Sequence, residues 1–225
     1  MTDPAERVAE LRRLSAEWRG CTACALAAGR TQVVVGDGDP QADLMFVGEA
    51  PGFHEDRQGV PFVGQAGKLL DSLLGEIGLA RERVYIANVL KCRPPGNRDP
   101  QPDEIAACEG HLFAQVELIR PRVICTLGNF ATKLLSGQPA GITRVHGRPQ
   151  RRRIGGQELI LYPIFHPAAA LYTPSMLESL RQDFARLPEL LADRPAPAAV
   201  PEPVLAAVAV PAPAAEPEYA QLGLF

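Results

Sequence analysis

Residues 44–52 read LMFVGEAPG, an apolar run that stops at a Gly-Glu-Ala-Pro-Gly turn. The run 44–47 is short and wholly apolar, which is typical of a strand buried on both faces of a parallel sheet. In such sheets, ligands bind beyond the carboxyl ends of the strands. The two glycines let the backbone approach a flat ligand closely, and Pro51 stiffens the turn. We therefore expect a binding site directly after this strand.

Three further segments have the same apolar character, and helical segments separate them. The expected strands are 43–47, 84–90, 123–127 and 159–165. The expected helices are 4–19, one starting near Gln65, 102–120, a short one ending near Ser136, and 175–191. This alternation predicts an α/β fold, a three-layer α/β/α domain with a central four-stranded, mostly parallel sheet.

Polar side chains stand where these four strands end. They are Glu49, Asn88, Asn129 and His166. Because the carboxyl ends of parallel strands meet at one edge of a sheet, we expect these side chains on one rim.

The 225-residue chain fits one domain followed by a tail. We place the domain at 1–194, where acidic and basic residues balance, and an Ala/Pro-rich, extended linker at 195–220. No apolar run approaches the ~20 residues that a membrane span needs. The N-terminus lacks the basic-then-apolar order of a secretory signal. We expect a monomeric cytoplasmic protein with no membrane contact, in which structural disulfides are disfavoured.

Four of the five cysteines have settings typical of metal ligands. Cys21 and Cys24 form a C-x2-C pair, Cys92 lies in a Pro-rich loop, and Cys108 lies on the 102–120 helix. The second pair is not a C-x2-C, which favours a 4Fe-4S cluster over zinc; four ordinary buried thiols are the alternative. Such a cluster would be structural, since nothing in the spacing indicates redox chemistry. Cys125, inside an apolar strand, is expected to be a core residue.

Five arginines gather in a short stretch of the chain. They are Arg144, Arg148, Arg151, Arg152 and Arg153. A basic cluster of this kind either binds nucleic acid or forms a solvated surface loop.

Together these motifs resemble those of the family 4 uracil-DNA glycosylases. The motifs are GEAPG at 48–52, PFVG at 61–64, Asn88 with KCRPPGNR at 91–98, HPA at 166–168, and the four cysteines in the order of that family's cluster ligands. The resemblance covers about residues 5–190. It implies a monofunctional enzyme of base excision repair that hydrolyses the N-glycosidic bond of uracil in single- or double-stranded DNA and leaves an abasic site.

The resemblance also implies roles for individual residues. Phe62 would stack on the extruded base, and Asn88 would bind its N3-H and O4 edge and so reject cytosine. His166 would donate to uracil O2, while Glu49 would orient water or stabilise the cationic sugar. Backbone N-H groups near Ala50 and Gly52 would contact the uracil edge. These side chains also have structural alternatives: a core phenylalanine, a loop-capping amide, a packed histidine and a helix-terminal charge.

The expected DNA contacts lie outside this pocket. They are Arg93, Arg98, Arg144 and a wedge at Leu171 or, alternatively, Tyr172. The loop 93–98 contains no histidine that could bond covalently to DNA, so ordinary turnover is expected. We expect no lysine at the site and hence no Schiff-base lyase step.

The last five residues, QLGLF, resemble the peptide by which bacterial repair and replication proteins bind the sliding clamp. The anchors would be Gln221, Leu222, Leu224 and Phe225. An apolar C-terminus of no consequence is the alternative. The enzyme would thus be tethered to replicating DNA in the nucleoid.

Two other functions fit part of the pattern. One is a non-catalytic iron-sulfur module that binds DNA and recruits repair partners. The other is a glycosylase for another deaminated base.

Overall fold

Four parallel strands form the centre of a six-stranded sheet in this computed structural model, which describes residues 3–193. These strands are β2 (Leu44–Gly48), β3 (Tyr85–Asn88), β4 (Val123–Leu127) and β6 (Gln157–Ile164). The strand order is β1-β3-β2-β4-β6-β5, and the edge strands β1 (Asp37–Gly38) and β5 (Gln150–Ile154) pair antiparallel to their neighbours. The predicted fold class is confirmed.

The predicted number of strands, four, is wrong because both edge strands escape a search for apolar runs. β1 has only two residues, one of them glycine. β5 carries three consecutive arginines, of which Arg151 and Arg153 are exposed. These arginines therefore belong to a strand and not to a loop. Charged side chains on an edge strand also hinder pairing with another chain.

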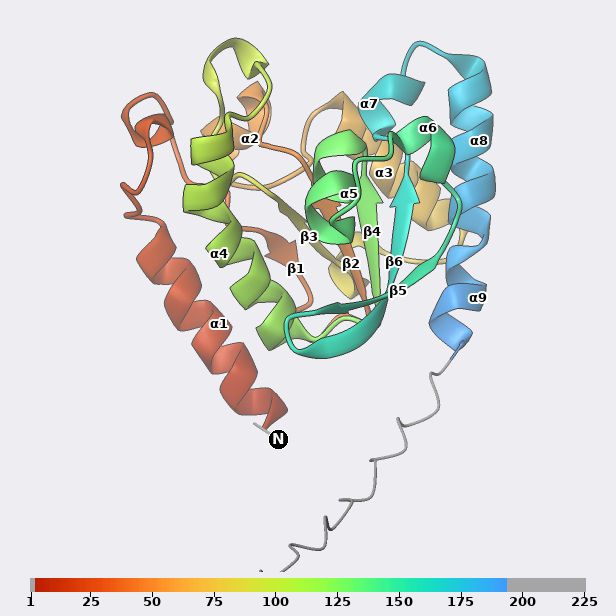
Figure 1. Cartoon of the computed structure of the whole chain (residues 1–225), viewed down its shortest axis with the longest axis horizontal. Helices are drawn as coiled ribbons and strands as arrows, with labels where there is room; N and C mark the ends of the chain where they lie inside the picture. The colour runs from red at the N-terminus through yellow and green to blue at the C-terminus, as the bar shows by residue number, and fades with distance from the viewer. Residues whose placement is uncertain (1–2, 194–225) are drawn as a thin grey trace, which may run out of the picture. The chain divides into compact units, whose positions relative to one another are not determined.

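Helices cover both faces of the sheet (Figure 1). On one face lie α1 (Pro4–Trp18), α4 (Pro102–Ile119) and α5 (Asn129–Ser136). On the other lie α3 (Gln65–Glu76), α8 (Pro174–Ala185) and α9 (Leu187–Ala192). Short helices are α2 (Phe53–Gln58), α6 (Ile142–Val145) and α7 (Pro167–Ala170), and 3-10 turns are η1 (Ala25–Ala28), η2 (Arg81–Arg83) and η3 (Pro95–Asn97). The three-layer prediction is thus confirmed.

The buried strand β2 explains why both faces need cover. Met45 and Val47 pack into the core under α1 and α4, whereas Leu44 and Phe46 pack into the core under α3 and α8. All four are at most 2% exposed. A strand that alternates between two apolar cores reads as one continuous apolar run, which is what the sequence shows.

Two helices differ from expectation. The predicted helix 175–191 is divided into α8 and α9 at Arg186, because Pro188 in the first turn of α9 has no N-H for the preceding turn. The short helix α2 lies within the stretch expected to be loop. It ends at Gly59, whose φ of +72° suits glycine.

The topology brings the carboxyl ends of the strands to one rim. The chain leaves β2 for β3 on one side and later reaches β4 on the other, so β2 lies where the strand order reverses. Glu49 follows β2, Asn88 ends β3 and His166 follows β6. Asn129 follows β4, but its Oδ1 accepts the N-H of Ile142 at 2.8 Å and holds the start of α6.

Within residues 3–193, no helix is long and apolar enough to cross a membrane. The predicted linker 195–220 and the predicted clamp peptide 221–225 lie outside the residues that the structure describes.

Candidate active site

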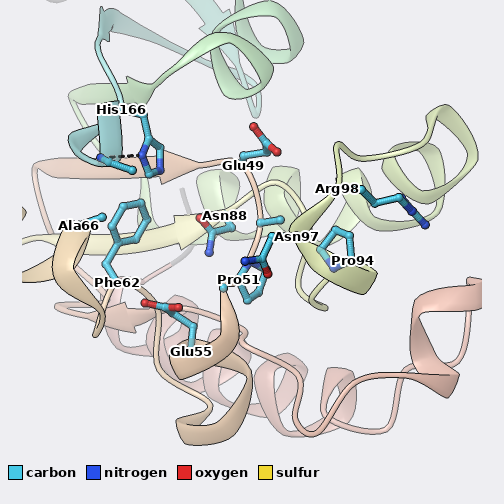
Figure 2. Close-up of a pocket in the computed structure, with 13 residues that line it drawn as sticks. Glu49, Pro51, Glu55, Phe62, Ala66, Asn88, Pro94, Asn97, Arg98 and His166 are labelled. Carbon is cyan, nitrogen blue, oxygen red and sulfur yellow. Dashed lines mark hydrogen bonds between the residues drawn. The ribbon is translucent and has the colours of Figure 1, made fainter. Parts of the chain in front are cut away.

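A pocket of about 370 Å³ opens at the rim beside β2 (Figure 2). Its walls come from the loop after β2, the start of α3, the end of β3 with the loop that follows it, and the loop after β6. The lining residues are Glu49, Ala50, Pro51, Gly52, Glu55, Phe62, Ala66, Asn88, Pro94, Asn97, Arg98, His166 and Ala168. The structure therefore gathers the predicted catalytic and substrate-binding residues around one cavity.

The amide of Asn88 is buried at the floor of this pocket. The residue is 1% exposed, and its Oδ1 has no hydrogen-bond partner among the described residues. Gly48 makes room for it, because a Cβ at Gly48 would lie 2.4 Å from Asn88 Oδ1 and 2.7 Å from Phe62 Cζ. A buried carbonyl oxygen without a partner is costly to keep, so it is a natural acceptor for a ligand.

The ring of Phe62 forms a wall of the same cavity. It is 6% exposed, and its centroid lies 5.5 Å from that of His166 with the planes inclined by 30°. The backbone of Phe62 is left-handed, with φ of +52°, which is unusual for a bulky side chain. Backbone conformations of this kind cluster at active sites and ligand pockets, so Phe62 is a candidate functional residue.

His166 is held as a neutral imidazole with a defined proton position. Burial lowers its pKa to about 4, and the negative charge of Glu55 opposes that shift. Its Nδ1 lies 3.1 Å from the backbone nitrogen of Ala168 and accepts that N-H. Since Nδ1 acts as the acceptor, Nε2 carries the proton of the neutral ring. The site thus has a neutral N-H donor.

Glu49 is the half-buried carboxyl group of the pocket. Burial raises its pKa, and the nearby negative charge of Asp99 raises it further. The histidine pKa is lowered while the carboxyl pKa is raised, so both shifts favour the uncharged forms. A histidine and a carboxyl group with opposed shifts in one cavity are typical of an active site.

Glu55 is a pocket residue that the sequence analysis did not single out. Its Oε1 accepts the N-H groups of Val63 and Gly64, both at 2.9 Å, so it ties α2 to the loop that presents Phe62. A Cβ at Gly52 would come within 2.7 Å of Glu55 Oε2. Ala66 was missed as well, and so were Pro94 and Asn97, although both of these lie within the quoted motif KCRPPGNR. Only the folded loops show which of their side chains reach the cavity.

Lys91 belongs to the motif KCRPPGNR, so the motifs do contain a lysine, whereas none was expected at the site. It stands three residues after Asn88, is 1% exposed, and donates from Nζ to the carbonyl of Asn88 at 2.8 Å and to Gln115 Oε1 at 2.6 Å. Burial lowers its pKa to about 7. Its amine is not among the groups that line the pocket.

The four predicted metal-ligating cysteines belong to one side of the sheet. Cys92 and Cys108 are buried in the core under α1 and α4, and Cys24 packs against that core. The pKa of Cys92 is raised to about 11, chiefly by burial, with smaller contributions from Cys108 and Cys24. The pKa of Cys108 is also raised, chiefly by burial, and Cys24 and Cys21 contribute to the rise. The four thiols are therefore close enough to interact.

N-H donors surround these sulfur atoms. The backbone N-H of Lys91 donates to Cys108 Sγ at 3.2 Å, and Arg30 Nη1 donates to Cys92 Sγ at 3.6 Å. His111 Nε2 lies 3.5 Å from Cys21 Sγ. Among residues 3–193, however, no three His, Cys, Asp or Glu side chains lie close enough to hold a single metal ion. Cys125 is fully buried in the opposite core, as expected.

The predicted DNA-contacting residues lie in different settings. Arg93 stacks 5.2 Å from the ring of the exposed Phe53 and donates to Asn97. Arg98 forms a two-point ion pair with the buried Glu104 at the start of α4. The other two, Arg144 in α6 and Leu171 after α7, do not line this pocket.

Comparison with known proteins gives this site a family. The model of the "Uracil DNA glycosylase superfamily" matches residues 35–190, a range that contains the whole six-stranded sheet and the residues that line the rim pocket. A "Type-4 uracil-DNA glycosylase" from Sulfurisphaera tokodaii is 46% identical over 80% of this chain and 84% of its own length. Proteins of the same name from Archaeoglobus fulgidus (46%; 77% and 89%) and Thermotoga maritima (51%; 67% and 78%) also match. The chain belongs to the type-4 uracil-DNA glycosylases.

The titration of His166 tests the electrostatics of the pocket. An NMR titration of the imidazole nitrogens should give a pKa of about 4, with the proton on Nε2 at higher pH. In Glu55→Gln the pKa of His166 should fall further. The carboxylate of Glu55 stabilises the imidazolium, and the substitution removes that stabilisation. The His166→Gln variant assigns the signal. A pKa near the ordinary ~6.5 of histidine, or a rise in Glu55→Gln, would contradict this description.

Proposed function

We propose that this protein hydrolyses the N-glycosidic bond of uracil in DNA and leaves an abasic site for base excision repair. The observation that carries the proposal is the buried Oδ1 of Asn88, which has no hydrogen-bond partner in the described part of the chain and lines the same pocket as the ring of Phe62. An amide offers one acceptor and one donor group, which match the N3-H and O4 of uracil. Because that edge is paired inside a duplex, the nucleotide must be extruded to reach the pocket.

Substrate selection follows from the same amide. Cytosine presents an acceptor at N3 and a donor at position 4, so both of its groups would oppose those of Asn88. A polar site that cannot satisfy its buried groups rejects a ligand strongly. The ring of Phe62 covers one face of the base, and the backbone at Ala50 and Gly52 borders its edge. The cavity of about 370 Å³ has room for a single base.

Cleavage develops negative charge on the uracil ring and positive charge on the sugar. We assign to His166 the N-H donor for uracil O2, because a neutral donor already in place stabilises the departing anion. We assign to Glu49 the carboxylate that orients the attacking water or faces the cationic sugar. Lys91 has its amine bound to Asn88 and Gln115, which supports hydrolysis without a Schiff base and thus a monofunctional enzyme.

We further propose that Cys21, Cys24, Cys92 and Cys108 hold a 4Fe-4S cluster. The thiols interact electrostatically, and N-H groups already point at their sulfur atoms. Four cysteine thiolates are the usual ligand set of a 4Fe-4S cluster. When bound, the cluster would cross-link the segment after α1, the loop after β3 and α4, and it would supply no reaction step.

Removal of one ligand tests the cluster. Cys108→Ala should lack iron and acid-labile sulfide and should unfold at a lower temperature, because cluster binding contributes to folding. Cys125→Ala, in the opposite core, should keep both elements. Zinc in place of iron, or an unchanged iron content in Cys108→Ala, would contradict the assignment.

DNA would cross the rim above the pocket. Arg93, stacked on Phe53 near the mouth, and Arg144 on α6 are proposed phosphate contacts. Arg98 would place its charge there while bound to Glu104. Leu171, beside the 89%-exposed Tyr172, remains the proposed wedge for the gap left by the extruded base.

Uracil release is the test of the proposed function. The wild-type protein should free uracil from an oligonucleotide, and Asn88→Ala should lower kcat/KM by roughly 100-fold or more, because two hydrogen bonds to the base are lost. Asn129→Ala is the matched control: it removes an amide from the same rim that serves α6 instead. Equal losses of kcat/KM in both variants would contradict the role proposed for Asn88. Faster release of hypoxanthine or xanthine than of uracil would point to another deaminated base, and release of no base to a non-catalytic module.

The proposed partner beyond DNA is the sliding clamp, through residues 221–225. We propose a monomer that the tail tethers to replicating DNA in the nucleoid. The support is the QLGLF pattern alone, since these residues lie outside the described part of the chain.

Deletion of residues 221–225 should abolish capture of the sliding clamp in a pull-down, because all the proposed anchors of the peptide are lost. Uracil release by the truncated protein should equal that of the full chain. Unchanged capture of the clamp would contradict the tether.

A further inference from the structure

The loop that presents Phe62 is held by an arginine from a distant part of the chain. Arg81 lies in η2, between α3 and β3. Its Nη1 donates to the carbonyl of Phe62 at 3.0 Å, and its Nη2 donates to the carbonyl of Pro61. One guanidinium thus fixes two consecutive peptide groups, which a planar fork of donors can do and a point charge cannot.

The backbone at Phe62 needs such support. Its φ of +52° lies in a region that bulky residues rarely adopt, and such conformations persist only where the surroundings impose them. The loop also lies directly against α3, since a Cβ at Gly67 would lie 1.8 Å from the carbonyl oxygen of Phe62. The carbonyl group of Phe62 is therefore contacted both by the backbone at Gly67 and by the guanidinium of Arg81.

The orientation of Arg81 is itself fixed. Its side chain is 18% exposed and lies 3.2 Å from Asp71 and 3.7 Å from Asp37. These two carboxylates come from α3 and β1, so the arginine joins three elements around the loop. Because the carboxylates balance its charge, we assign its effect on the pocket to geometry rather than to electrostatic attraction of DNA.

We propose that Arg81 is a positioning residue of the glycosylase site: it holds Phe62 so that the ring covers the face of the bound base. The inference rests on the proposed uracil pocket. Arg81 is not among the residues that line the cavity, and it acts through the two carbonyls. Without the two hydrogen bonds from Arg81, the backbone at Phe62 can leave the left-handed conformation and carry the ring away from the base. Base binding and the alignment of the glycosidic bond would both suffer.

A double-mutant cycle tests this role through kcat/KM for a uracil-containing single strand. Arg81→Ala should lower kcat/KM by roughly 10- to 100-fold, the scale expected when a substrate-positioning group shifts by about an ångström. In a Phe62→Ala background, the same substitution should change kcat/KM by less than about twofold, because its effect passes through the missing ring. An equal loss in both backgrounds, or no loss in the wild-type background, would overturn the proposal.

Two further variants keep the test independent of folding. Arg81→Lys keeps the charge but can bond only one of the two carbonyls well. It should therefore recover little of the lost kcat/KM, while its thermal unfolding stays near that of the wild type. Full recovery of kcat/KM would overturn the proposal. Arg83→Ala removes an exposed arginine from the same turn and should leave kcat/KM unchanged. If the wild-type protein releases no uracil, the proposed function itself is contradicted, and with it the basis of the inference.

Discussion

The side-chain oxygen of Asn88 is the constraint on which the pocket depends. A buried acceptor left without a donor costs about 1–3 kcal/mol, so the fold gives up stability at this point. It does so at the end of the central strand β3, where Asn88 is 1% exposed. Gly48 opens the space in front of the oxygen, and no protein donor fills that space within residues 3–193. A ligand with an N-H group at the matching position regains what the protein lost.

In the proposed reaction, the groups around Asn88 stabilise charge that appears only during bond cleavage. His166 stays neutral because burial disfavours its cation, yet it keeps one N-H directed by the bond from Ala168 to Nδ1. A neutral donor costs less to bury than an imidazolium and still stabilises an anion as it forms. Glu49 lines the same pocket. In the proposed reaction, the carboxylate of Glu49 faces the cationic sugar and His166 faces the uracil anion.

The sequence was informative where one local pattern decided the structure. The runs at β2, β3, β4 and β6 are apolar because both faces are buried, and parallel strands must end at a common rim, so Glu49, Asn88 and His166 could be placed together in advance. Family resemblance supplied their chemical roles, which spacing alone does not. The edge strands could not be predicted, since β1 has only two residues and β5 contains three consecutive arginines instead of an apolar run.

What the sequence could not give were contacts between distant segments. Glu55 binds the loop eight residues on, Lys91 turns inward to Gln115, and Arg81 reaches back to Phe62; no periodicity marks any of these contacts. Asn129 shows the opposite error, since it shares the rim but its amide serves α6. A residue's place at the end of a strand predicts that it lies near the site. Whether its side chain takes part in the site depends on the groups to which it is bonded.

The most direct measurement is a crystal structure of the protein with free uracil bound. We predict that Asn88 Oδ1 accepts the uracil N3-H at about 2.7–3.2 Å, with the ring of Phe62 against the base and His166 Nε2 directed at O2. Uracil bound elsewhere on the molecule, or in the pocket with Asn88 Oδ1 still lacking a donor, would contradict the account.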